Sequence, residues 1–119
     1  NIHFISIDNI HFSNKAIYYK KLLSDNFTVI QFNSIKFLIV NKEFPTNINS
    51  NQKLIVDYII MTDNANVKII DLVNIFSTRK IIIDSSNDFK HAQKWTDQCK
   101  NLGIPCHYTN TDGFFKQKI

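Results

Sequence analysis

The stretch RKIIIDSSNDFKHAQKWTDQCKNLGIPCHYTNTDGFF, residues 79–115, carries the clearest structural pattern in this chain. It opens on Ile81-Ile82-Ile83, a run that is apolar on both faces and is typical of a central strand covered on both sides. Residues 84–87 predict a turn, and residues 88–102 predict an amphipathic helix. Gly103 then stands where a left-handed residue ends a helix at little cost. The stretch therefore predicts a strand, a turn and a helix in the order of a βαβ unit.

The helix predicted for residues 88–102 carries one apolar stripe. Its members, spaced three, four and three residues apart, are Ala92, Trp95, Cys99 and Leu102. That spacing places them on a single helical face, so we expect all four to face the core. After the helix we predict a strand at residues 104–108, a tight turn at 110–113 and a closing strand at 114–119. Together these three segments predict a hairpin.

Four further strands are predicted from runs rich in apolar and β-branched residues, at 2–8, 27–32, 35–40 and 58–62. The second and third of these strands flank Asn33-Ser34, a turn pair that predicts a hairpin. The polar stretch 41–53, which contains Pro45, predicts a surface loop.

Two more helices are predicted, at residues 13–24 and 67–76. The apolar spacing of the second helix predicts an inward face made of Ile70, Val73 and Phe76. Both helices are short, so their stability would depend on packing of that face.

The alternation of strands and helices after residue 54 decides the fold class. Two consecutive βαβ units require at least three parallel strands, while the hairpins near both ends of the chain add antiparallel strands. We therefore predict an α/β fold with a mixed β-sheet, βαβ units and flanking helices. A chain of 119 residues is one domain, residues 1–119. Because it begins at Asn1 within a strand-like run, we expect it to be a fragment of a longer protein.

The net charge of +4 comes from scattered lysines, and Arg79 is the only arginine. Lysine lacks the planar geometry that reads bases or clamps phosphates, so this charge is a weak indication of nucleic-acid binding. Two lysine pairs lie near aromatic residues and are candidate contacts to single-stranded DNA; they are Lys20, Lys21, Lys116 and Lys118. Aromatic side chains at these spacings more often fill a core, and we favour that interpretation of them.

Three aspartates follow predicted strands: Asp8, Asp63 and Asp84. In open α/β sheets ligands gather outside the carboxyl ends of the strands, so these acids are a candidate metal site. Acids in such positions also begin turns and cap helices. We favour this second interpretation.

The histidines and cysteines form no recognisable catalytic or metal motif. The four histidines, none of them in a His-x-His or i, i+4 pair, are His3, His11, His91 and His107. Cys99 and Cys106 are too few for a disulfide framework and do not form a Cys-x-x-Cys pair. We predict that both are free thiols, buried or half-buried. No apolar run approaches the ~20 residues that cross a bilayer.

Four segments in the second half of the chain carry a family resemblance: DYIIMTDNA (57–65), KIIIDSSNDF (80–89), NLGIPCHYT (101–109) and NTDGFF (110–115). They resemble the C-terminal part of the metallo-β-lactamase-like domain in ComEC-type competence proteins, which are membrane channels for DNA uptake. The SSN turn before a Trp-bearing helix and the LGIP step are most similar to ComEC-related proteins of the Bacteroidetes. The resemblance implies the second half of a metallo-β-lactamase-like fold, in a soluble domain that is membrane-associated through its parent.

The chain departs from that family pattern where active members hold their metal. Active members have Gly-Asp where this chain has Asn41-Lys42, and a His-His turn where it has Asp63-Asn64. The His-x-His-x-Asp-His motif is absent from these 119 residues. A zinc site without imidazoles has no activated water. The resemblance thus implies a degenerate domain that is no enzyme and takes no cofactor, with Asp63, Asn64 and Asn87 as a vestigial rim.

The sequence leaves two functions open. The first is a non-catalytic domain that assists DNA uptake as a DNA-binding or assembly module. Its expected partners are single-stranded DNA and the membrane part of the parent protein, and no small-molecule substrate is indicated. The second is part of a metal-dependent phosphodiesterase or nuclease whose histidine ligands lie upstream of Asn1.

Overall fold

The computed structural model describes residues 4–7, 18–20, 28–45 and 53–118. In chain order the elements are β1 (Phe4–Ile7), β2 (Tyr18–Lys20), β3 (Thr28–Phe32), β4 (Ile35–Val40), β5 (Leu54–Ile55), β6 (Tyr58–Met61), α1 (Ile69–Val73), β7 (Phe76–Ser77), β8 (Lys80–Ile83), α2 (Phe89–Leu102), β9 (Cys106–Tyr108), α3 (Thr109–Asp112) and β10 (Phe115–Lys118).

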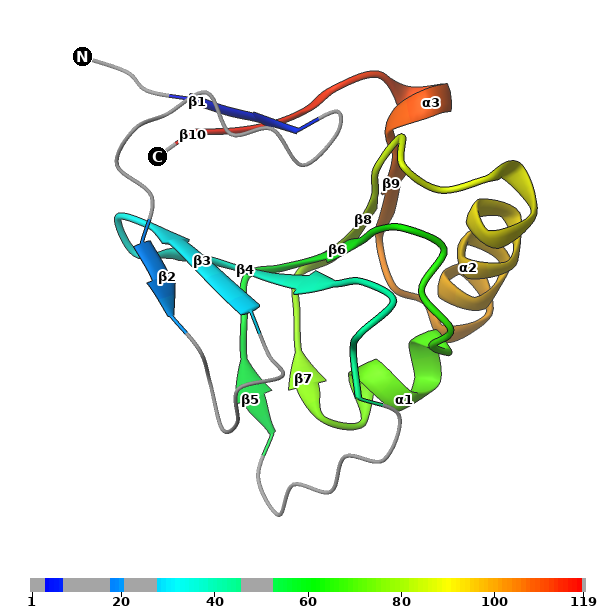
Figure 1. Ribbon diagram of the computed structural model, residues 1–119, viewed down its shortest axis with the longest axis horizontal. Coiled ribbons are helices and arrows are strands. Elements are labelled where there is room, and N and C mark those ends of the chain that lie inside the picture. Colours follow the sequence, from blue (N-terminus) through cyan, green and yellow to red (C-terminus); the bar gives the residue numbers. More distant parts are fainter. Residues whose placement is uncertain (1–3, 8–17, 21–27, 46–52, 119) are drawn as a thin grey trace.

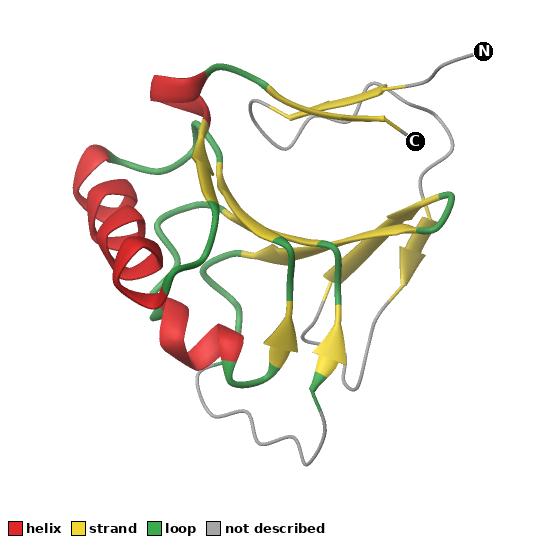
Figure 2. Ribbon diagram, turned by 180° about the vertical axis from the view of Figure 1, so that it is seen from behind, coloured by secondary structure: helices red, strands yellow, loops and turns green. Residues whose placement is uncertain are grey.

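A six-stranded mixed sheet forms the centre of the molecule, with strand order β2-β3-β4-β6-β8-β9. The pairs β4–β6, β6–β8 and β8–β9 are parallel, and the pairs β2–β3 and β3–β4 are antiparallel. The curved sheet carries α1 and α2 on one side and the β1–β10 ribbon on the other (Figures 1 and 2). The predicted α/β class, with a mixed sheet and βαβ units, is confirmed.

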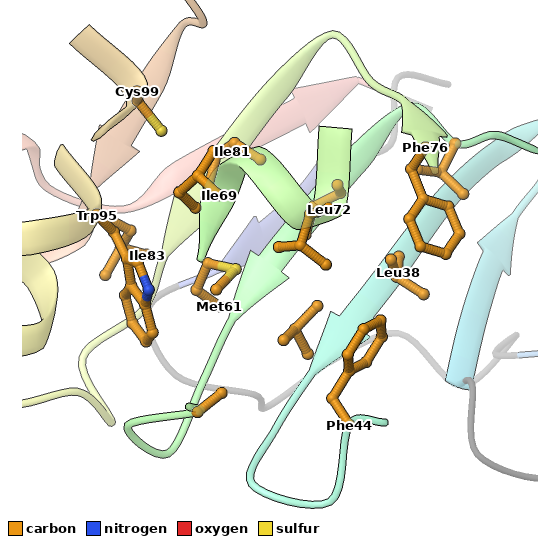
Figure 3. Close-up of a cluster of buried hydrophobic side chains, with 14 of the residues drawn as sticks. Leu38, Phe44, Met61, Ile69, Leu72, Phe76, Ile81, Ile83, Trp95 and Cys99 are labelled. Carbon is orange, nitrogen blue, oxygen red and sulfur yellow. The ribbon is translucent and has the colours of Figure 1, made fainter. Parts of the chain in front are cut away.

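Each face of the sheet packs against its own cluster of buried side chains. On the helix side, Ile69 and Leu72 of α1 and Trp95 of α2 pack over the isoleucines and Met61 of the central strands (Figure 3). On the other side, Phe115 of β10 packs with the aromatic rings of Phe37 and Tyr58. The side chains of Ile81, Ile82 and Ile83 are fully buried, as a strand covered on both faces requires.

Helix α2 forms as predicted, because both of its ends are capped. The Asp88 carboxylate accepts a hydrogen bond from the His91 backbone N–H at 2.8 Å, which makes Asp88 the N-cap. Gly103 ends the helix in the left-handed region with φ of 70°. The prediction of a fully inward stripe is wrong for Leu102, which is 40% exposed. Leu102 is the last helical residue, where the helix has passed the edge of the sheet cluster.

Helix α1 is shorter than predicted and its inward face is rotated by one residue. Ile69 and Leu72 are buried, while Ile70 is 42% exposed, so the predicted inward role of Ile70 is wrong. The helix ends at Val73, so Phe76 lies in β7 and not in a helix. There β7 pairs in parallel with β5, a two-residue ribbon that the sequence did not indicate.

Two further predictions are wrong. The helix predicted at 13–24 is a strand where it is described: β2 pairs antiparallel with β3, with Tyr18 opposite Gln31. The tyrosines there suit a pleated surface, and cross-strand pairing outweighs the local helical pattern. The closing hairpin is also absent, because the predicted turn is α3 and β10 pairs antiparallel with β1 instead of β9. The remainder of 13–24 lies outside the described residues.

None of the helices in the described ranges combines the length and the apolar content that a membrane span requires.

Candidate functional site

The candidate site is the rim at the carboxyl ends of the parallel strands. It consists of the turns that follow β4, β6 and β8, at residues 41–43, 62–64 and 84–88. Open α/β sheets bind ligands at this edge, since the loops that leave neighbouring strands converge there. Hydrogen bonds join the second turn to the third, and Thr62 of the second turn donates its backbone N–H to the carbonyl of Val40 at the end of β4 at 2.8 Å.

Asn64 and Asn87 hold the second and third turns together. The Asn64 backbone N–H donates to the Asn87 Oδ1 at 2.9 Å, and the Asp88 N–H donates to the Asn64 Oδ1 at 2.7 Å. The buried Asn87 amide donates from Nδ2 to the Met61 carbonyl at 2.7 Å and to the Asp84 carbonyl at 3.1 Å. The structure therefore brings these predicted rim residues together, and both side-chain oxygens accept backbone N–H groups.

Asp84 is fully buried at the start of the third turn. Its Oδ1 accepts the Ser86 backbone N–H at 3.0 Å, the Ser86 hydroxyl, and the Asn87 Nδ2 at 3.3 Å. These donors all bind one carboxylate oxygen, and the Ser86 N–H forms the local hydrogen bond of a turn-forming aspartate, so the predicted turn-making role of Asp84 is confirmed.

Asp63 and Asn64 both adopt the left-handed region, with φ of 53° and 52°. Aspartate and asparagine tolerate this conformation better than other non-glycine residues, so the sharp turn after β6 needs no glycine. The Asp63 N–H donates to the Ser86 hydroxyl at 2.9 Å, and its side chain is exposed. Asp63 is thus a rim carboxylate that solvent can reach, as are Glu43 and Asp88.

In the turn after β4, too, an asparagine side chain accepts a backbone N–H. The Asn41 Oδ1 accepts the Glu43 N–H at 3.0 Å. The Asn41 carbonyl accepts the Phe44 N–H at 3.0 Å, which closes the turn. Lys42 is exposed and would repel a cation at this place.

The rim residues do not fit a zinc ion. The turns at 41–43, 62–64 and 84–88 contain no histidine or cysteine, and these are the ligands that zinc prefers. Within the described parts of the chain, no three histidine, cysteine, aspartate or glutamate side chains form a group suited to a metal. Asp8 lies outside the described residues, so the candidate metal site of Asp8, Asp63 and Asp84 stays a prediction.

The two histidines that the structure describes have structural partners. The His91 ring Nδ1 lies 2.8 Å from the Asp88 Oδ1, and the His107 Nε2 lies 2.7 Å from the Gly113 carbonyl oxygen. The backbone N–H of His91, followed by its ring, holds the pKa of the Asp88 carboxyl below its ordinary value of 3.8. His3 and His11 lie outside the described residues.

Cys99 and Cys106 are free thiols, as predicted, with Cys99 buried and Cys106 half-buried. A hydrogen bond between the two side chains raises the pKa of the Cys99 thiol and lowers the pKa of the Cys106 thiol. The pair joins the end of α2 to the start of β9 on the helix side of the sheet.

The lysines predicted as DNA contacts lie on two different sheets. Lys20 belongs to β2, at the edge of the six-stranded sheet, whereas Lys116 and Lys118 belong to β10. Lys116 is exposed, because Phe115 and Gln117 on either side of it face the central sheet. Lys21 lies outside the described residues. The side chains of Lys20 and Lys118 also lie outside the described parts of the structure, so the DNA-contact role of these lysines stays a prediction.

Sequence reasoning did not identify a basic cluster at the opposite end of the sheet, where the parallel strands begin. Arg79 lies with its guanidinium carbon 5.3 Å above the Tyr58 ring centre, and Lys80 Nζ lies 5.7 Å from the centre of the Phe115 ring. In the sequence, this cluster was indicated only by the Arg79-Lys80 pair, which stands directly before the buried residues Ile81 to Ile83. Two charged side chains at that place must stay near solvent, at the start of the strand. The contact with β10 could be found only from the fold.

Comparison with known proteins gives one family. The model of the ComEC C-terminal domain matches residues 1–119. Searches of curated proteins and of solved structures returned no match to the chain.

Proposed function

Because the chain belongs to the ComEC C-terminal domain family, we propose that it is a non-catalytic domain of a ComEC-type DNA-uptake protein. It serves the parent membrane protein by binding DNA or by supporting assembly. We further propose that it is a degenerate relative of the metallo-β-lactamase-like domains, of the kind found in the Bacteroidetes.

The observation that supports a non-catalytic role is the use of the rim side chains. The Asn41 side chain accepts a backbone N–H of its own turn, while the side chains of Asn64 and Asn87 each accept a backbone N–H of the neighbouring turn. A side-chain oxygen that is held by a backbone donor is poorly placed to bind a metal or a substrate. The rim thus has the position of an α/β active site, while its polar groups stabilise the turns.

Three acids of the rim are exposed, Glu43, Asp63 and Asp88, and in the described parts of the chain they belong to no group of ligands suited to a metal. Metal-assisted phosphodiester cleavage needs several ligands around a metal that lowers the pKa of its bound water. Asp63 shares the rim with Asp84, whose Oδ1 is surrounded by turn donors, and with Lys42, whose charge opposes a cation. This donor set favours a structural rim.

The test combines metal analysis, a cleavage assay and a binding assay on the purified chain. We expect no stoichiometric zinc after dialysis, no cleavage of a labelled single-stranded oligonucleotide with added zinc or manganese, and affinity for that oligonucleotide that falls with salt. Asp63→Ala should change none of these, like its surface control Asp71→Ala. One zinc per chain, or cleavage that only Asp63→Ala abolishes, would establish the nuclease alternative. Absence of binding at 25 mM salt would leave assembly as the role.

A further inference from the structure

The charges of the central sheet are separated between its two ends. At the amino ends of the parallel strands lie three basic residues, Lys36, Arg79 and Lys80, and one acid, Asp57, which forms an ion pair with Arg79. At the carboxyl ends lie the acidic residues of the rim. An anionic ligand is therefore attracted to the amino ends, away from the edge where α/β sheets usually bind ligands.

Backbone hydrogen bonds align Lys36, Asp57 and Arg79 in one row across the starts of the strands. The Asp57 N–H donates to the Lys36 carbonyl at 3.0 Å, and the Arg79 N–H donates to the Asp57 carbonyl at 3.0 Å. The Asp57 carboxylate is occupied within the row, because its Oδ2 accepts the Lys36 N–H at 2.8 Å and its Oδ1 lies 3.7 Å from Arg79 Nη1. Neutralisation of one cation by Asp57 leaves the row with a net positive charge.

Two buried rings form a floor beneath the cations. The Tyr58 and Phe115 rings are in contact with centres 5.0 Å apart, and they carry Arg79 and Lys80 respectively. A cation held over an aromatic face keeps its charge and loses part of its freedom, which lowers the entropic cost of binding a phosphate. The Arg79 side chain remains 62% exposed, so its guanidinium is accessible to a phosphate or to the face of a base.

Two residues next to Phe115 add an exposed ring and another cation: Phe114, directly before β10, and Lys116 within it. Phe114 is 58% exposed and precedes Phe115, and the exposed Lys116 follows it. An exposed aromatic ring next to cations suits a nucleic acid with unstacked bases, because a base can stack on the ring while its phosphate meets a lysine. A duplex offers phosphates only, since its base faces are covered.

We propose that these residues form a binding surface for single-stranded DNA, here called the amino-end surface: Arg79, Lys80, Phe114 and Lys116. This inference rests on the proposed function and, of the two roles named there, DNA binding and assembly, selects DNA binding. Arg79 and the lysines bind phosphates, and Phe114 stacks on a base. The surface shares only Lys116 with the lysines expected from the sequence.

The test is fluorescence anisotropy of the chain with a labelled dT20 oligonucleotide between 25 and 200 mM NaCl. Each phosphate contact adds about 0.7 to the slope of log affinity against log salt for a single strand. We expect Arg79→Gln/Lys80→Gln to weaken binding about tenfold at low salt and to reduce the slope by roughly 1.4. Phe114→Ala should weaken binding at least fivefold with little change of slope, since stacking is insensitive to salt.

The matched control is Lys90→Gln/Lys94→Gln, which removes the same charge from exposed positions of α2 on the opposite side of the sheet. Thermal melts show whether each variant folds. If the Lys90→Gln/Lys94→Gln variant loses as much affinity as the Arg79→Gln/Lys80→Gln variant, the amino-end surface is refuted while DNA binding stands. The same conclusion holds if duplex DNA binds as tightly as dT20. If the unaltered chain does not bind dT20 at 25 mM NaCl, the DNA-binding form of the proposed function fails as well.

Discussion

Replacement of Asn87 by alanine tests the conclusion that the rim is structural. The Asn87 side chain is buried and takes part in three strong hydrogen bonds, to the Asn64 N–H and to the carbonyl groups of Met61 and Asp84. Each net hydrogen bond contributes about 1 kcal/mol, and a buried group left without a partner costs about 1–3 kcal/mol. Because the Met61 carbonyl also accepts the Asp84 N–H at 3.3 Å, it is not left unbonded. We expect a loss of about 3 kcal/mol.

That loss converts to a change in melting temperature. The entropy of unfolding is about 2.1 cal/mol/K per residue, or roughly 250 cal/mol/K for this chain of 119 residues. Asn87→Ala should therefore lower the Tm by about 12 °C in a melt followed by circular dichroism. The control is Asn101→Ala, which removes an exposed amide from α2 and should shift the Tm by less than about 2 °C.

A second variant separates the hydrogen bonds from the loss of volume. Asn87→Asp keeps the shape but places a carboxylate oxygen where Nδ2 now lies, 3.3 Å from the Asp84 Oδ1. Two carboxyl groups at that distance cannot both ionise without a large cost. This variant should be much less stable at pH 7 than at pH 4, relative to the unaltered chain. A Tm within 3 °C of the parent for both Asn87 variants would refute a structural role of the rim.

Three other predictions follow from local features. Gly103→Ala should cost about 1 kcal/mol, or ~4 °C in Tm, because φ is 70° and no atom lies near the added Cβ to compensate; an unchanged Tm would contradict this. The lowered pKa of Asp88, caused by the His91 N–H, contributes stability above pH 3.8 that disappears as the pH falls through the folded value. Asp88→Asn should therefore melt below the parent at pH 6 and with it at pH 2. Iodoacetamide should alkylate Cys106 before Cys99 in the folded chain, as peptide mass mapping would show, because their hydrogen bond lowers the pKa of the first and raises that of the second; equal labelling would argue against the pairing.

Structural features that depend only on residues close together in the chain could be predicted from the sequence. The isoleucine strand β8, the capped helix α2 and the Asn33 turn with φ of 52° depend on neighbours in the chain, and all three are present. The β1–β10 ribbon joins residues more than a hundred positions apart, so no local pattern could show its pairing. In α1 the five helical residues are too few to set a phase, and Ile69 and Ile70 fit an inward face equally well before the packing is known.

Of the two candidate surfaces, one could be predicted from the sequence and the other could not. The carboxyl-end rim could be anticipated because parallel topology alone brings the turns after β6 and β8 together, and Asn64 meets Asn87 there. The amino-end surface could not, because it depends on β10 crossing the sheet and setting Phe115 beneath Lys80. Lys80 is a scattered lysine in the sequence, and becomes part of a cluster only through that contact.

The different roles that we propose for the two ends of the sheet have one physical reason, which is the access of solvent to their polar groups. At the carboxyl ends, Asp84 is fully buried, and the side-chain oxygens of Asn64 and Asn87 accept backbone N–H groups. At the amino ends, the buried rings stay beneath and the charges stay in solvent, with Arg79 more than half exposed. A polar group stabilises a fold by being satisfied and binds a ligand by being available. By that criterion the end of the sheet that holds Arg79 is the one able to meet a polyanion.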